Sequence, residues 1–320
     1  MNNVIPDWLT GVLPVLPTPF TPDDEVDLPA VPRLVTFALW CGVRTVVTPA
    51  FGSEFYKLDG GERQRVIEAV VAQAQPRSLR VVVQCNHTTP HLAARLASEA
   101  KGLGASAVST ALPRAFAASE NQLLDYARRV CDATDLPVIV QDWNPGGRTA
   151  NAEFFIALHQ HCANFRLAKL EEPGIGDMVR VIFSATGGRV GVLSGWGGSY
   201  AVQLHGAGIC GLMPGLALAD VFVRLWSYLN EDENQRALNE FSQIAPYLQF
   251  SLQTFEQFHH AEKYVLWRRG ALANPFVRPV TVELDANSRS YLELLTKNLL
   301  ALIERASSGA NFNAPETSRK

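Results

Sequence analysis

The sequence predicts an α/β fold, a (β/α)8 TIM barrel with a C-terminal helical extension. Eight short apolar runs rich in β-branched residues recur before residue 220, and segments with helical spacing separate most of them. Alternation of buried strands with helices is typical of a parallel sheet, and eight such units fit a closed barrel better than an open doubly wound sheet. No GxGxxG motif follows the first run, which disfavours a dinucleotide-binding fold.

The expected strands and helices alternate along the chain. Strands are expected at residues 11–20, 42–50, 79–86, 105–112, 136–143, 165–172, 189–196 and 208–215. The clearest helices between them are expected at residues 28–39, 61–75, 89–103, 120–134 and 152–162.

Three segments are expected. Residues 1–219 would form the barrel, and residues 220–306 would form a helical extension packed against it. Within the extension, helices are expected at residues 220–229, 231–245, 255–269 and 288–306. The polar tail, residues 307–320, is expected to be flexible.

Composition and charge exclude several classes of partner. The net charge is −3 and no basic block is present, so nucleic acid is not an expected partner. Five dispersed cysteines without a CxxC pair are typical of free thiols in a reducing compartment. No apolar run approaches the ~18 residues of a membrane span, and the first residues lack a signal-peptide pattern. We therefore expect a cytoplasmic protein that binds no membrane.

Lys169 is the residue that most strongly indicates chemistry. It lies within the apolar run 165–172, whereas the other five lysines fall on polar helix or loop stretches. An unpaired ammonium in a buried strand is strongly disfavoured, and a neutral amine is a nucleophile toward carbonyl groups. Lys169 is therefore a candidate Schiff-base lysine. The alternative is a buried structural lysine paired with Glu171 or Glu172.

Other candidate residues stand at the ends of the expected strands, since the active sites of such barrels lie at the carboxyl ends of their strands. Side chains alternate along a strand, so Glu171 shares a face with Lys169 and is the first candidate for proton transfer. The alternative for Glu171 is a carboxylate in solvent at the rim. The fifth and seventh runs end in further candidates, Gln141, Asp142, Gly195 and Trp196.

Two more strand ends carry candidates. The turn Gly52-Ser53-Glu54 offers backbone N–H groups and a hydroxyl, which suit a substrate carboxylate, although Gly and Ser also occur at strand ends for turn reasons alone. His87 follows the third run and is a second candidate for proton transfer. No histidine has a carboxylate at a zinc-site spacing, so no metal is expected.

From Gly11 to Ala306 the chain resembles the dihydrodipicolinate synthase/N-acetylneuraminate lyase family. The likeness is carried by the Thr-Pro-Phe that ends at Phe20, by the turn that ends at Glu54, and by Ala-Lys-Leu-Glu around Lys169. The resemblance implies a class I lyase whose lysine forms a Schiff base with a small 2-oxo acid. It also implies a barrel that needs no cofactor and a homo-oligomer, a dimer or a tetramer.

The sequence departs from the family pattern near this lysine. Gln141 stands where the family carries a proton-relaying tyrosine, and a glutamine cannot exchange protons near neutral pH. Phe51 and Gly52 stand where the family carries two hydroxyl residues, and Leu112-Pro113 replaces a tyrosine of the synthase.

The 2-keto-3-deoxy-L-arabonate dehydratase-like branch of this family is more similar at the same places. The residues that carry this likeness are Ser53-Glu54, His87, Val140-Gln141-Asp142 and Lys169-Leu170-Glu171-Glu172-Pro173-Gly174.

We interpret the sequence as a lyase that acts on a 2-oxo acid through Lys169, and specifically as a dehydratase of a 2-keto-3-deoxy sugar acid. Alternatives are a pyruvate-dependent aldolase, dihydrodipicolinate synthase, and a 2-oxo acid-binding barrel without turnover. Glu171 is the first candidate for proton transfer and His87 is the second. Substrate would be held by Gly52, Ser53, Glu54, Asp142, Gly195 and Trp196, with Gln141 orienting its hydroxyl groups.

Overall fold

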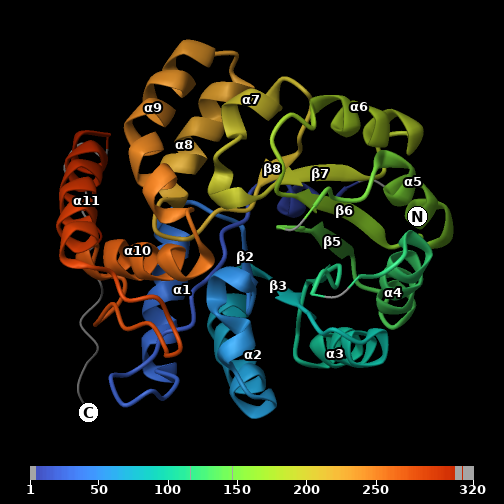
Figure 1. Ribbon diagram of the computed structural model, residues 1–320, viewed down its shortest axis with the longest axis horizontal. Helices are drawn as coiled ribbons and strands as arrows, with labels where there is room; N and C mark the ends of the chain where they lie inside the picture. Colours follow the sequence, from blue (N-terminus) through green and yellow to red (C-terminus); the bar gives the residue numbers. More distant parts are fainter. Residues whose placement is uncertain (1–4, 116, 146, 307–311, 313–320) are drawn as a thin grey trace.

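The computed structural model describes residues 5–115, 117–145, 147–306 and 312. Its strands are β1 Gly11–Val12, β2 Thr45–Thr48, β3 Arg80–Gln84, β4 Ala107–Ala111, β5 Val138–Asp142, β6 Phe165–Leu170, β7 Gly191–Ser194 and β8 Gly211–Leu212. They form one parallel sheet in the order β1-β8-β7-β6-β5-β4-β3-β2. Between β1 and β2 the sheet closes at a parallel bridge from Val15 to Val47, which confirms the predicted barrel (Figure 1).

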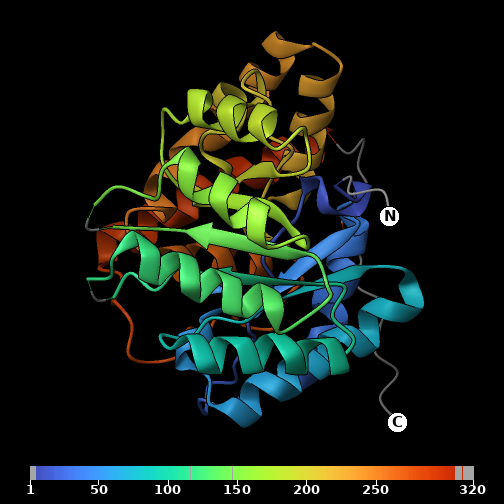
Figure 2. The same ribbon diagram turned by 90° about the vertical axis from the view of Figure 1, so that its right-hand side faces the viewer.

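Helices follow the strands and surround the barrel. They are α1 Val31–Trp40, α2 Gly60–Ala74, α3 Pro90–Gly102, α4 Glu120–Asp132, α5 Ala152–His161, α6 Gly176–Ala185, α7 Ala201–His205 and α8 Ala219–Asn230, followed by α9 Asn234–Ser251, α10 Phe255–Arg268 and α11 Ala286–Ala306. Short 3₁₀ helices are η1 Asp7–Leu9, η2 Leu28–Ala30, η3 Phe51–Ser53, η4 Phe55–Lys57, η5 Gln75–Arg77 and η6 Trp196–Gly198. In the side view of Figure 2, helices lie on both sides of the strands.

Most expected helices are present with ends shifted by a few residues, but the sequence analysis did not predict α6 or α7. Helix α6 begins without a side-chain cap and α7 is only five residues long, so neither has a clear start signal. By contrast, α2 begins at a capping box in which Asp59 accepts from the Glu62 N–H (2.7 Å) and Glu62 accepts from the Asp59 N–H (3.0 Å).

The side chains of each strand alternate between two apolar layers. On β6, Leu167 packs inside the barrel with Ile139 and Leu193, whereas Ala168 packs in the layer between the sheet and the helices. Because side chains on one strand alternate, this pattern places Lys169 on the inner face, one pleat above Leu167.

The C-terminal helices pack beside the barrel. Helix α9 contacts α8, α10 and α11 (Figure 1). The expected boundary between residues 219 and 220 falls within the first turn of α8, and the division into two domains stays a prediction. Apart from Phe312, the tail 307–320 lies outside the described residues.

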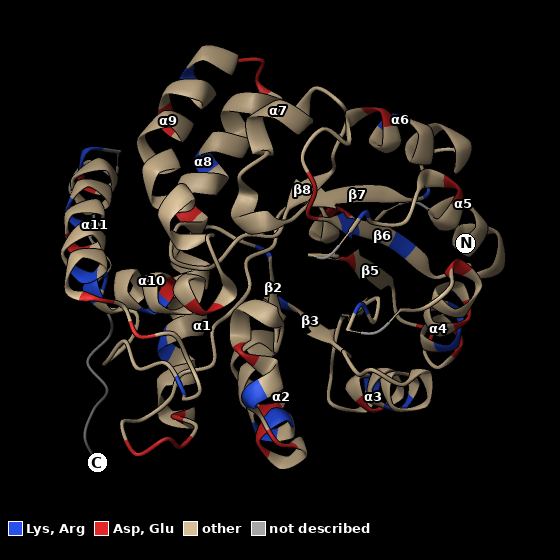
Figure 3. Ribbon diagram, viewed as in Figure 1, with Lys and Arg blue, Asp and Glu red and all other residues tan. Residues whose placement is uncertain are grey.

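Charged residues of both signs are mixed along the outer helices and loops (Figure 3). Within the described part of the chain, no helix has both the length and the apolar character needed to cross a membrane.

Helix α10 is held against the barrel mouth by buried charges. Lys263, only 1% exposed, donates to Glu54 Oε1 (2.5 Å) and to the Phe276 carbonyl oxygen (3.0 Å). Lys57 donates to Glu54 Oε2 (3.0 Å) and to Glu256 Oε2 (2.9 Å). Burial lowers the pKa of Lys263 to about 8, while the neighbouring Glu54 carboxylate opposes that change.

These contacts correct one inference from the sequence. Lys263 and Lys57 were assigned to polar stretches, but both side chains are buried. The helical segment around Lys263 is polar, and no local pattern indicates that Glu54, 209 residues away, pairs with it. Burial alone therefore does not distinguish Lys169; its position inside the barrel does.

We predict that Lys263→Met lowers the free energy of unfolding by about 3 kcal/mol or more, because it removes one partner of the buried Glu54 carboxylate. Adding Glu54→Gln should restore part of the loss, since no uncompensated charge remains. Urea unfolding followed by circular dichroism measures both. The matched control is Lys101→Met, which breaks the exposed pair with Asp135 and should change stability little. An equal loss in Lys263→Met and Lys101→Met would contradict the prediction.

Candidate active site

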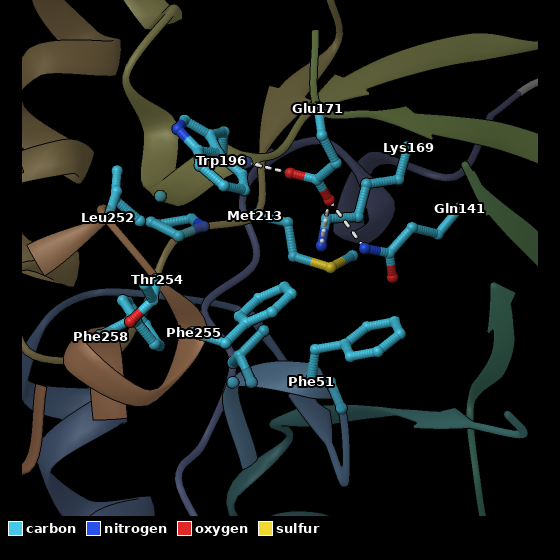
Figure 4. A pocket seen from close by; sticks show the side chains of 16 residues that line it. Phe51, Gln141, Lys169, Glu171, Trp196, Met213, Leu252, Thr254, Phe255 and Phe258 are labelled. Atoms are coloured by element: carbon cyan, nitrogen blue, oxygen red, sulfur yellow. Dashed lines mark hydrogen bonds and ion pairs between the residues drawn. The ribbon is translucent and has the colours of Figure 1, made fainter. Parts of the chain in front are cut away.

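Lys169 stands at the carboxyl end of β6, inside the barrel. It lies in register with Gln141 on β5 and Leu193 on β7, and it is 7% exposed. Its Nζ lies 2.9 Å from Glu171 Oε1 (Figure 4). The structure therefore brings together the amine and the carboxylate that strand alternation had placed on one face.

Glu171 accepts hydrogen from three donors. Besides Lys169, Gln141 Nε2 donates to Oε1 (2.7 Å), and the backbone N–H of Trp196 donates to Oε2. The carboxylate is 8% exposed. Three donors on a nearly buried carboxylate fix its orientation. A solvated rim position for Glu171 is therefore inconsistent with the structure.

Gly195 leaves room for this carboxylate. A Cβ atom at position 195 would lie 2.0 Å from Glu171 Oε2, so no larger residue fits without displacing the carboxylate. The next residue, Trp196, has a positive φ of 46° and turns its N–H toward Glu171. Through Gly195 and Trp196, the turn after β7 thus contacts the Glu171 side chain, which follows β6.

A cavity opens beside Lys169, Glu171 and Gln141, and its walls are largely apolar. The wall residues include Phe51, Trp196, Met213, Leu252, Phe255 and Phe258 (Figure 4). Phe51 and Phe255 stack with centroids 5.3 Å apart, and Trp143 meets Phe255 edge-on at 4.5 Å. Aromatic rings from η3, α10 and the loop after β5 thus enclose the polar group.

The turn after β2 is arranged differently from the expectation. Gly52 lines the cavity, but Ser53 is fully buried and its hydroxyl donates to the Leu16 carbonyl oxygen (2.5 Å). Glu54 points to Lys263 rather than to the cavity. Among the described residues, the N–H groups of Phe51 and Gly52 have no hydrogen-bond acceptor, so these two donors are available to a ligand.

His87 and Asp142 lie apart from the Lys169 cavity. His87 is exposed and lines a neighbouring cavity with Asn86, Arg114 and other residues. Asp142 is fully buried and accepts from Arg114 Nε (2.8 Å) and from the Ala150 N–H (2.6 Å), so it ties together the loops after β4 and β5.

Several residues in or next to the cavity were not predicted from the sequence. Phe255 and Phe258 come from α10, which carries no local signal that it reaches the mouth of the barrel. Gln84 on β3 donates through Nε2 to Gln141 Oε1 (2.7 Å). The sequence signal available for Gln84 was its position as a polar residue at the carboxyl end of an apolar strand. The same signal identified Gln141.

Two further groups near the cavity have shifted pKa values. Burial, and then the Glu171 charge, raise the pKa of Tyr200. Burial raises the pKa of Glu262 to about 7; its carboxylate accepts from the Ala217 N–H (2.7 Å). In the described part of the chain, no three His, Cys, Asp or Glu side chains gather in an arrangement that could ligate a metal.

Known proteins are similar to this chain over all or part of its length. The L-2-keto-3-deoxyarabonate dehydratase of Azospirillum brasilense is 24% identical over 302 residues, covering 92% of this chain and 96% of that protein. The 4-hydroxy-tetrahydrodipicolinate synthase of Laribacter hongkongensis is 32% identical over 141 residues, covering 44% of this chain and 47% of that protein.

Solved structures share the fold. The dihydrodipicolinate synthase of Rhodopseudomonas palustris superposes with a TM-score of 0.85 at 23% identity, covering 92% of this chain and 99% of that one. YagE of Escherichia coli K12, solved in complex with pyruvate, superposes with a TM-score of 0.82 at 20% identity, covering 91% and 99%. The model of the dihydrodipicolinate synthetase family matches residues 8–196, and the chain belongs to this family.

Proposed function

We propose that this protein is a lyase in which Lys169 forms a Schiff base with a 2-oxo acid, and that it dehydrates a 2-keto-3-deoxy sugar acid. The observation that carries the proposal is the Lys169–Glu171 pair at the carboxyl end of β6, beside a cavity with largely apolar walls. The similarity to the Azospirillum dehydratase over 96% of its length supports the reaction type.

The first step is imine formation. The Lys169 amine bonds to C2 of the substrate, and the carbonyl oxygen leaves as water. Glu171 Oε1, 2.9 Å from Nζ, is placed to take a proton from the amine and return it to the departing oxygen. The C1 carboxylate would lie on the free N–H groups of Phe51 and Gly52.

The second step is elimination. The C3–H bond breaks, its electrons form the enamine, and the proton moves to Glu171. The enamine electrons then expel the C4 hydroxyl, which takes up that proton and leaves as water. The conjugated imine that remains loses a proton from C5 and gains one at C3, the resulting enol becomes an aldehyde at C5, and hydrolysis of the imine then frees the semialdehyde and Lys169. Gln141 would orient the carboxylate and the departing hydroxyl, since its amide cannot carry a proton.

We predict that Lys169→Ala abolishes covalent trapping of pyruvate by borohydride. Lys169→Arg should also give no trapped adduct, because arginine stays protonated and cannot form the imine. Intact mass and peptide mapping locate the adduct. Lys263→Met is the matched control, since Lys263 is a second buried lysine outside the cavity, and it should still be trapped. An adduct on Lys263, or none with any 2-oxo acid, would refute the role of Lys169.

We predict that Glu171→Gln lowers turnover by ~10²–10⁴-fold, the usual contribution of a general acid or base, while trapping at Lys169 survives. Glu172→Gln is the matched control, because Glu172 accepts from the Thr149 N–H (2.7 Å) outside the cavity and should matter much less. Steady-state rates and trapping yields are compared on the same samples. If Glu171→Gln keeps full activity and His87→Ala does not, the proton-transfer role belongs to His87.

The products decide the reaction type. With 2-keto-3-deoxy-L-arabonate, a dehydratase should yield a semialdehyde of unchanged carbon count, measured by mass spectrometry. Release of free pyruvate would instead identify an aldolase. Turnover of pyruvate with aspartate semialdehyde at ~1–10³ s⁻¹ would identify the synthase. Trapping without turnover of any of these substrates would identify a binding barrel.

A further inference from the structure

Gln84 is a fully buried polar residue that the mechanism above does not use. It ends β3 two residues after Val82, which packs inside the barrel, so its side chain faces the same interior. Its Nε2 donates to Gln141 Oε1 (2.7 Å), and Gln141 Nε2 donates to Glu171 Oε1 (2.7 Å). A chain of hydrogen bonds thus runs across the barrel from β3 to the Lys169–Glu171 pair.

The Glu171 carboxylate sets the donor-to-acceptor direction of these hydrogen bonds. An ionised Glu171 can only accept hydrogen, so Gln141 must turn its Nε2 toward Glu171. Gln141 Oε1 then faces Gln84 and needs a donor, because a buried polar atom without a partner is costly. Gln84 Nε2 is that donor. The direction therefore follows from the charge of Glu171 and does not depend on how either amide is assigned.

The opposite direction would change the charge of Glu171. If Gln141 turned its amide, Oε1 would face Glu171 Oε1, and two acceptors would oppose each other. That arrangement is relieved when Glu171 is protonated and donates to Gln141. A protonated Glu171 cannot take a proton from C3.

We propose that Gln84 is a positioning residue for proton transfer: it locks the Gln141 amide so that Glu171 is presented to the substrate as an oriented, ionised base. The inference rests on the proposed function, in which Glu171 takes the C3 proton. Gln84 does not line the Lys169 cavity, so its effect on the reaction passes through Gln141 alone.

Pyruvate separates the two steps and serves as the probe. Imine formation is measured by borohydride trapping at Lys169. Proton transfer is measured by exchange of the C3 hydrogens of pyruvate for deuterium, followed by NMR over a range of pD. The samples are wild type, Gln84→Met, Gln84→Glu and the control Ser109→Ala. Ser109 on β4 is the register partner of Gln84, is fully buried, and takes no part in the hydrogen-bond chain.

Gln84→Met keeps the size of the side chain but removes the donor. We expect trapping close to the wild-type level and exchange slower by about tenfold, less than the ~10²–10⁴-fold for deleting the base itself. Ser109→Ala should match wild type in both measurements. If Gln84→Met loses trapping and exchange to the same extent, Gln84 has a general structural role and the proposal is overturned. Exchange at the wild-type rate in Gln84→Met would also overturn it.

Gln84→Glu gives a result that a structural role does not predict. At low pD the protonated carboxyl donates to Gln141 Oε1 and should restore exchange. As pD rises through the pKa of this buried carboxyl, the donor is lost and the carboxylate competes with Glu171 for the Gln141 N–H group, so exchange should fall to the level of Gln84→Met or below it. A pD profile without this descending limb would also overturn the proposal. If wild type itself forms no adduct and shows no exchange, the proposed function fails, and this inference falls with it.

Discussion

The Glu171 carboxylate is the point on which the candidate active site depends. It accepts from the Lys169 amine, the Gln141 amide and the Trp196 N–H, so side chains or backbone from β5, β6 and the turn after β7 meet at one group. Carboxylates in a site of low exposure are costly unless each oxygen has donors, and these donors also fix the direction in which each partner points. Gly195 is part of the same constraint, because any side chain there would occupy the space of the carboxylate.

A second set of buried charges holds the wall of the cavity. Lys263 and Lys57 bind Glu54 from two sides, which fixes α10 against the turn after β2. Phe51 belongs to that turn and Phe255 begins α10, and their rings stack at 5.3 Å. The ion pairs therefore decide where the aromatic wall stands, although none of the charged groups lines the cavity.

The fold could be predicted from the sequence because its signals are local and repeated. Buried strands recur eight times, amphipathic segments separate most of them, and strand alternation alone placed Lys169 and Glu171 on one face. The roles of Ser53 and Glu54 could not be anticipated in this way. The Ser53 hydroxyl donates to the Leu16 carbonyl oxygen, 37 residues earlier in the chain, and the partner of Glu54 comes from a helix 209 residues later. Contacts between distant segments leave no periodic pattern in the sequence.

Part of the aromatic wall comes from a different part of the chain than Lys169 and Glu171. Gln141, Lys169 and Glu171 lie within residues 8–196, which match the family model, whereas Phe255 and Phe258 lie beyond that range. Substitutions in α10 can reshape the space around the substrate while the amine and its carboxylate stay unchanged. Evolution can therefore alter which ligand fits beside Lys169 by changing one helix, and the same helix is the natural place to begin when engineering a new specificity.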